Sequence, residues 1–125
     1  MAGDPVDAAL GTDPVSIGVP LDDLRRRIDE FPTDAYLLTV GDDGRPHSVA
    51  VSVRWVRDEF VVPAGRTTLA NARARPLVVL LWPPPERGGF SLIVDAEARG
   101  DGDTVALRPT NAVLHRAPDP SGEGV

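Results

Sequence analysis

Residues 35–83 read AYLLTVGDDGRPHSVAVSVRWVRDEFVVPAGRTTLANARARPLVVLLWP, and this stretch decides the fold. From His47 to Trp55 the odd-numbered residues are apolar or His, and the even-numbered residues are small or polar. That period of two is the pattern of a half-buried β-strand. The GDDG at 41–44 contains an Asp-Gly step suited to a tight hairpin turn, so the apolar run at 35–40 is the predicted partner strand.

The middle of the stretch predicts a third strand followed by a helix. Arg57-Asp58 marks a second turn, and residues 59–63 form the next strand, whose proline places its end at a sheet edge or bulge. A helix is expected at about 69–74, with Thr67 or Thr68 as its N-cap.

Further strands are predicted towards the C-terminus. Residues 77–82, LVVLLW, show no alternation, so we expect them to be buried on both faces, inside a barrel or at an interface. Residues 90–99 alternate again, and the GDG at 100–102 is a hairpin turn. A last strand is expected at 104–116, interrupted at Pro109.

The N-terminal part predicts a short amphipathic helix at 21–31. Its apolar residues recur at the spacing of one helical face: Leu21, Leu24, Ile28 and Phe31. Residues 1–19 are rich in Gly, Pro and Asp and lack periodicity, so we expect a flexible N-terminal arm. Residues 118–125 are expected to be a flexible tail.

Together these elements predict one mainly β domain, at residues 20–117 of the 125-residue chain. About six antiparallel strands joined by tight turns close best as a small barrel, because closure removes exposed sheet edges. The expected architecture is therefore a six-stranded antiparallel barrel with two short helices.

The composition excludes several kinds of chemistry. All 13 Lys and Arg residues are Arg, and Cys is absent. The chain therefore has no lysine Schiff base, thiolate nucleophile, disulfide or Cys-based metal site. Its net charge of −6 at pH 7 argues against a general nucleic-acid binder, which needs a basic face. No apolar run approaches the ~20 residues of a membrane span and no signal peptide is recognisable, so we expect a cytoplasmic protein.

Few reactive groups stand out. His47 and His115 lack the spacing of a metal site. The sequence contains no nucleophile-elbow, dinucleotide-binding or phosphate-loop motif. Asp95 and Glu97 share one strand face, which we interpret as a solvated face rather than an acid–base pair.

The turn into the second helix is where polar groups are expected to converge. Arg66, the hydroxyls of Thr67 and Thr68, and the free N–H groups of a helix N-terminus would surround one small volume. Such a cluster suits a phosphate or another anion. The alternative is that one threonine simply caps the helix and Arg66 is solvated.

Four motifs carry a resemblance to a known family: YLLTV at 36–40, DGRPH at 43–47, GRTTLAN at 65–71 followed by Pro76, and LIVDAEA at 92–98. Over about residues 22–116 the chain resembles the FMN-binding split-barrel family, the pyridoxamine 5′-phosphate oxidase-like proteins, in its actinobacterial type. The resemblance implies a split β-barrel that forms homodimers, with two flavin sites at the dimer interface. The implied cofactor is FMN or the deazaflavin coenzyme.

The resemblance also carries over a set of cofactor-binding residues: His47, Ser48, Ala50, Ser52, Val62, Pro63, Arg66, Thr67, Thr68 and Asn71. The family usually has a basic pair where this chain has Thr67-Thr68, and often a lysine at the position of Ser52. Each charge-assisted hydrogen bond lost in this way weakens binding by roughly 1.5–3 kcal/mol.

Two hypotheses about function follow from the resemblance. The first is an oxidoreductase in which the flavin or deazaflavin carries the hydride and a small organic molecule is the substrate. The second is a non-catalytic split-barrel dimer that binds flavin weakly or not at all and acts as a carrier, sensor or interaction module. A haem binder using a histidine is a third, more distant hypothesis. No catalytic residue is predicted.

Overall fold

The computed structural model describes residues 14–118, and this range contains eight β-strands and two α-helices. In chain order the elements are β1 (Val15–Gly18), α2 (Leu21–Ile28), β2 (Asp34–Val40), β3 (Pro46–Ser52), β4 (Arg54–Val56), β5 (Glu59–Pro63), α3 (Arg66–Ala74), β6 (Leu77–Trp82), β7 (Ser91–Asp101) and β8 (Thr104–Arg116).

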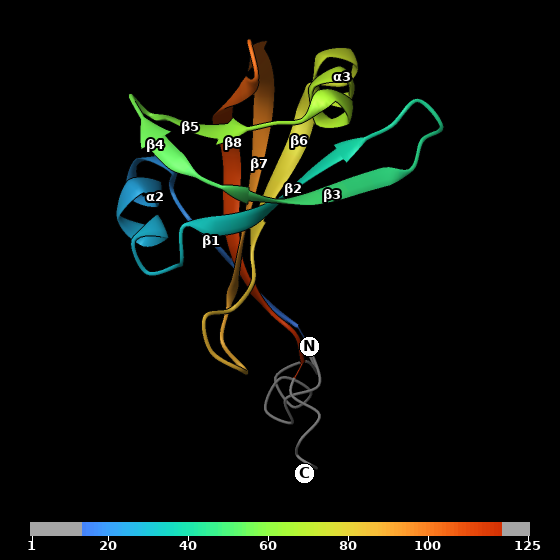
Figure 1. Cartoon of the computed structure of the whole chain (residues 1–125). Helices are drawn as coiled ribbons and strands as arrows, with labels where there is room; N and C mark the ends of the chain where they lie inside the picture. Colours follow the sequence, from blue (N-terminus) through green and yellow to red (C-terminus); the bar gives the residue numbers. More distant parts are fainter. Residues whose placement is uncertain (1–13, 119–125) are drawn as a thin grey trace.

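The strands form one antiparallel sheet that curls on itself. Their order is β3-β2-β6-β7-β8-β5-β4, and β1 pairs with β8. The two strands at the ends of this order, β3 and β4, are consecutive in the chain and are separated only by Val53. The sheet must therefore bend until its two ends meet, and Figure 1 shows β2 and β3 crossing in front of β6, β7 and β8.

The predicted number of six strands is wrong, in part because the segment 47–55 forms two strands. Ser52 pairs with Asp34 of β2, whereas Arg54 pairs with Val61 of β5. The strand exchanges one partner for the other at Val53. Residues on both sides of this exchange keep the same alternation, so the sequence pattern carried no sign of it.

The N-terminal segment adds the other unpredicted strand. Val15–Gly18 pairs with the end of β8, so the flexible arm expected at 1–19 is wrong for this part. The five residues between Pro14 and Pro20 are too few to show a period. The rest of the expected arm, at 1–13, and the end of the expected tail, at 119–125, lie outside the described residues.

The last strand is continuous across Pro109, contrary to the predicted interruption. Asp95 pairs with Asn111 and Ala96 pairs with Pro109. Thr110 therefore has no opposite residue on β7 and forms a β-bulge. The bulge lets the strand continue past a residue that has no N–H to donate.

The helix α2 ends at Ile28, three residues earlier than predicted. Its apolar face is nevertheless the predicted one. Leu24 is fully buried, and Ile28 and Phe31 pack against the core, whereas Leu21 at the helix start is exposed.

The core lies inside the curled sheet, with Phe60 and Trp82 among its largest side chains. The Trp82 indole N–H donates to the carbonyl of Pro32 at 3.0 Å, so the buried polar atom is satisfied. In the single chain, the expectation that residues 77–82 are buried on both faces of the sheet is wrong. Val78, Leu80 and Trp82 are buried, but Leu77 is 74% exposed.

The turn between β4 and β5 is strained. Arg57 and Asp58 have φ values of +52° and +68°, which a side chain disfavours but a two-residue hairpin turn of this kind requires.

We expect Asp58→Gly to raise the free energy of unfolding by about 0.5–1 kcal/mol, because glycine adopts positive φ without a steric cost. Urea unfolding would measure it. Gly102→Ala, at φ +65° in the β7–β8 turn, is the opposite control and should destabilise.

Candidate functional site

The sheet leaves an opening between β3 and the end of β5. β3 pairs only with β2, and β4 covers one edge of β5 only as far as Val61. Beyond that point Pro63 faces β3 without a strand between them. A cavity of about 290 Å³ lies here, walled by β3, the end of β5 and the start of α3. We call it the α3 cavity.

Six of the ten predicted cofactor-binding residues line the α3 cavity: His47, Ala50, Pro63, Arg66, Thr67 and Thr68. The other four do not. Val62 is fully buried in the core, and Asn71 is buried beneath α3. Ser48 lies exposed on β3, and Ser52 lines a separate hollow with Arg54 between β3–β4 and β5.

The predicted threonine N-cap is wrong. The helix begins at Arg66 rather than 69, its N-cap residue is Gly65, and no side chain caps it. The first intrahelical hydrogen bond runs from the Leu69 N–H to the Gly65 carbonyl at 2.9 Å. The N–H groups of residues 66–68 therefore have no acceptor within the helix. Thr67 is exposed, whereas Thr68 is only 3% exposed and turns its side chain into the protein.

Two contacts hold α3 against β2 and the hairpin that follows it. The Asn71 side-chain amide donates to the Thr39 hydroxyl at 3.1 Å in the core. At the other end of the helix, the Arg75 guanidinium donates to the Val40 carbonyl and to the Asp42 carboxylate, both at 2.7 Å. Together they hold the helix in a position where residues 65–68, at its start, line the opening between β3 and β5.

Sequence reasoning missed the roles of Thr39 and Arg75. The sequence did contain a signal for Thr39, because Thr39 lies on the same core-facing side of β2 as Ala35 and Leu37. A hydroxyl on such a face needs a buried partner. Arg75 carried no comparable signal, since its acceptors come from a distant turn.

The charges around the α3 cavity are few. Arg66 forms no ion pair among the described residues, whereas six other arginines in residues 14–118 pair with carboxylates. The His47 Nδ1 is buried and has no hydrogen-bond partner among those residues. The arginines with a raised pKa lie elsewhere: hydrogen bonds and attraction from Asp23 and Glu59 raise the pKa of Arg26 and Arg99, respectively.

Residues 14–118 contain neither a metal-ion cluster nor a membrane-spanning helix. In this range no group of three or more His, Asp or Glu side chains is placed to hold a metal ion. Neither of its helices is long and apolar enough to span a bilayer.

Comparison of the sequence with known proteins identifies relatives. No family model matches the chain. An uncharacterized protein of Mycobacterium bovis is 39% identical over an alignment of 120 residues. The match covers 81% of this chain and 84% of that protein, and an uncharacterized protein of Mycobacterium tuberculosis gives the same values. The chain belongs to the family of these two mycobacterial proteins.

Comparison with solved structures shows that the chain has the split-barrel fold. An F420 reductase superposes with a TM-score of 0.58 at 19% identity, covering 70% of this chain and 94% of the other. A FAD-binding protein from Mesorhizobium loti superposes with a TM-score of 0.61 at 12% identity, covering 83% of this chain and 98% of the other. A pyridoxinephosphate oxidase family protein from Clostridium acetobutylicum superposes with a TM-score of 0.51 at 12% identity, covering 79% of this chain and 86% of the other. The predicted split β-barrel fold is confirmed.

The buried contact between α3 and β2 can be tested by substitution. Thr39→Val keeps the shape of the side chain but removes the acceptor, which leaves the Asn71 amide unpaired in the core. We expect a loss of about 1–3 kcal/mol in the free energy of unfolding, measured in urea. Thr33→Val, at an exposed position, should change it by less than about 0.5 kcal/mol. Equal losses for both variants would contradict this role.

Proposed function

We propose that this protein is an oxidoreductase that binds a flavin or deazaflavin coenzyme at the α3 cavity. The observation that carries the proposal is a convergence of groups suited to an anion. The N–H groups of residues 66–68 lack helical acceptors, Arg66 is unpaired within the described range, and the buried His47 Nδ1 has no partner there. Helix N-termini bind phosphate in this way.

The cavity residues fit the phosphate end of such a coenzyme. Arg66 supplies one positive charge, the first turn of α3 supplies N–H donors, and the exposed Thr67 hydroxyl supplies another donor. The His47 Nδ1 can donate or accept, depending on its tautomer. The volume of about 290 Å³ is at the lower limit for ligand sites, so a coenzyme needs further contacts from outside this cavity.

A second copy of the chain is the proposed source of these contacts. A row of directly paired residues crosses the outer face of the sheet from β3 to β8: Ala50, Tyr36, Leu81, Ile93 and Val113. We call this row the apolar stripe. Tyr36 is 45% exposed, although large apolar side chains are usually covered. Because Ala50 also lines the α3 cavity, a partner that covers the stripe would reach the edge of the cavity.

A bound flavin or deazaflavin would supply hydride transfer to a small organic substrate. The chain's own residues would hold the phosphate at α3 and keep water from the covered stripe. Among residues 14–118, no Asp, Glu, Tyr or Cys lines the cavity, and the titratable side chains that do are His47 and Arg66. This scarcity favours, as a second candidate function, a dimeric module that carries or senses the coenzyme without turning it over.

Titration of the purified protein with FMN and with the deazaflavin coenzyme F420 tests the proposed site. We expect micromolar or tighter binding of one of them, followed by fluorescence. Arg66→Ala should weaken it about tenfold, because it removes a charge-assisted bond. Arg57→Ala, on the exposed β4–β5 turn, should leave binding unchanged. If neither FMN nor F420 binds at high micromolar concentration, the proposal is overturned.

The two threonines provide a matched pair for the same assay. Thr67→Lys adds a cation at an exposed position beside Arg66, so it should tighten binding by about three- to tenfold. Thr68→Lys should instead destabilise the fold, because the Thr68 side chain is 3% exposed. Unchanged affinity in Thr67→Lys would place the phosphate elsewhere. A turnover assay with a reductant then distinguishes the two candidate functions, because only the oxidoreductase turns the coenzyme over.

The proposed dimer makes a separate prediction. Sedimentation equilibrium should find a dimer at tens of micromolar protein. Tyr36→Glu places a charge in the apolar stripe and should weaken dimerisation by at least about 100-fold while the monomer stays folded. Val56→Glu, at an exposed apolar position on β4 outside the stripe, is the control and should leave the dimer intact. A wild-type monomer at this concentration would refute the arrangement.

A further inference from the structure

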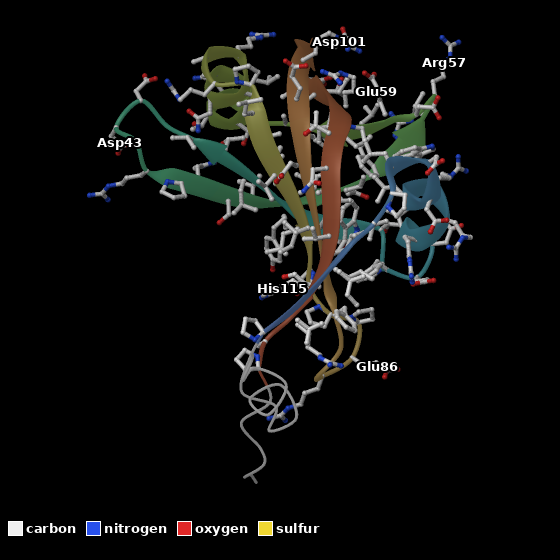
Figure 2. All side chains as sticks on the ribbon, turned by 180° about the vertical axis from the view of Figure 1, so that it is seen from behind. Asp43, Arg57, Glu59, Glu86, Asp101 and His115 are labelled. Atoms are coloured by element: carbon white, nitrogen blue, oxygen red, sulfur yellow. The ribbon has the colours of Figure 1, made fainter. Side chains whose placement is uncertain are left out.

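A second, larger cavity lies beside α2. Its volume is about 550 Å³, within the range of small-molecule sites, and it shares no lining residue with the α3 cavity. Helix α2, the connection from α2 to β2, and β4 form its walls. Figures 1 and 2 show α2 and α3 on opposite sides of the molecule. We call it the α2 cavity.

The apolar wall of the α2 cavity is held in place by aromatic packing. Trp55 lines the cavity and stacks edge-to-face on the fully buried Phe60, with ring centroids 4.6 Å apart. Phe60 in turn lies 5.5 Å from the ring of Trp82, which also lines the cavity. Phe31 and Val53 complete an apolar surface against which a flat ring can pack.

The polar groups of the α2 cavity favour a negative charge. Arg25 and Arg54 both line it, and neither forms an ion pair among residues 14–118. The neighbours of Arg25 on the helix differ, since Arg26 pairs with Asp23 and Arg27 with Glu30. The Arg25 guanidinium lies 5.9 Å from the Trp55 ring centroid, so a charged group and an aromatic face adjoin.

Other groups around the α2 cavity narrow the chemistry of its ligand. Asp29 is the one carboxylate of residues 14–118 that lines it, so together with the two arginines the described lining carries one net positive charge. Two backbone carbonyls of the wall already accept hydrogen bonds: Pro32 from the Trp82 indole and Thr33 from the Val53 N–H. The wall therefore offers guanidinium donors more than free acceptors.

We propose that the α2 cavity is a second ligand site, for a planar aromatic molecule that carries one carboxylate. The ring would pack against Trp55 and Phe31, and the carboxylate would bind Arg25 and Arg54. The site does not depend on a coenzyme at α3, so its test is independent of the proposed function.

Nuclear magnetic resonance titration of the full chain with 2-naphthoate tests this site. We expect saturable shifts of the Trp55 indole N–H, assigned with Trp55→Phe, and a dissociation constant below about 1 mM. The uncharged 2-naphthamide should bind at least about fivefold more weakly, because it loses the charge-assisted bonds. Arg25→Gln and Arg54→Gln should each weaken naphthoate binding about three- to tenfold, a range that allows for their exposure.

Three variants serve as controls. Arg57→Gln and Arg66→Gln remove cations outside the α2 cavity and should leave naphthoate binding unchanged. Asp29→Asn should tighten it, since it removes the only carboxylate of the cavity. Lack of a naphthoate shift at millimolar concentration, equal binding of naphthamide, or wild-type affinity in both arginine variants would each overturn the proposal.

Discussion

The hydrogen bond from the Asn71 amide to the Thr39 hydroxyl fixes where α3 lies, and the geometry of the α3 cavity depends on it. It joins side chains 32 residues apart within an apolar core. In such surroundings an unpaired amide is costly, so the two groups constrain the helix position and rotation more strictly than apolar packing does. Arg75 fixes the other end of α3 through Val40 and Asp42, at a more exposed position.

The curl of the sheet decides where the cavities occur. β3 and β4 belong to opposite ends of the strand order but are joined through Val53, so the sheet closes covalently there and stays open between β3 and Pro63. The α3 cavity occupies that opening. The α2 cavity lies on the other side of the exchange point, where α2 and its connection to β2 cover the start of β4. One change of strand partner thus separates two cavities whose linings differ in chemistry.

Arginine placement distinguishes these sites from the rest of an acidic surface. Seven of the 13 arginines form no ion pair within residues 14–118, and three of these seven, Arg25, Arg54 and Arg66, line the two cavities. Arg66 lies beside unbonded helix N–H groups, a setting suited to phosphate, whereas Arg25 and Arg54 lie beside aromatic rings, a setting suited to an aromatic acid. The exposed Tyr36 in the apolar stripe marks a third surface, which adjoins only the α3 cavity.

The sequence by itself determined the strands with a clear period of two, their buried faces, the positions of the turns and the fold class, because these depend on neighbouring residues. The resemblance carried by its motifs named ten cofactor-binding residues, and six of them line one cavity: five from β3 and the start of α3, and Pro63 from the end of β5. Only the tertiary structure decided the pairing of β1 with β8, the break at Val53, the burial of Thr68 beside the exposed Thr67, and the convergence of Arg25 with Arg54. Each of these depends on contacts between segments distant in sequence, which a local pattern does not encode.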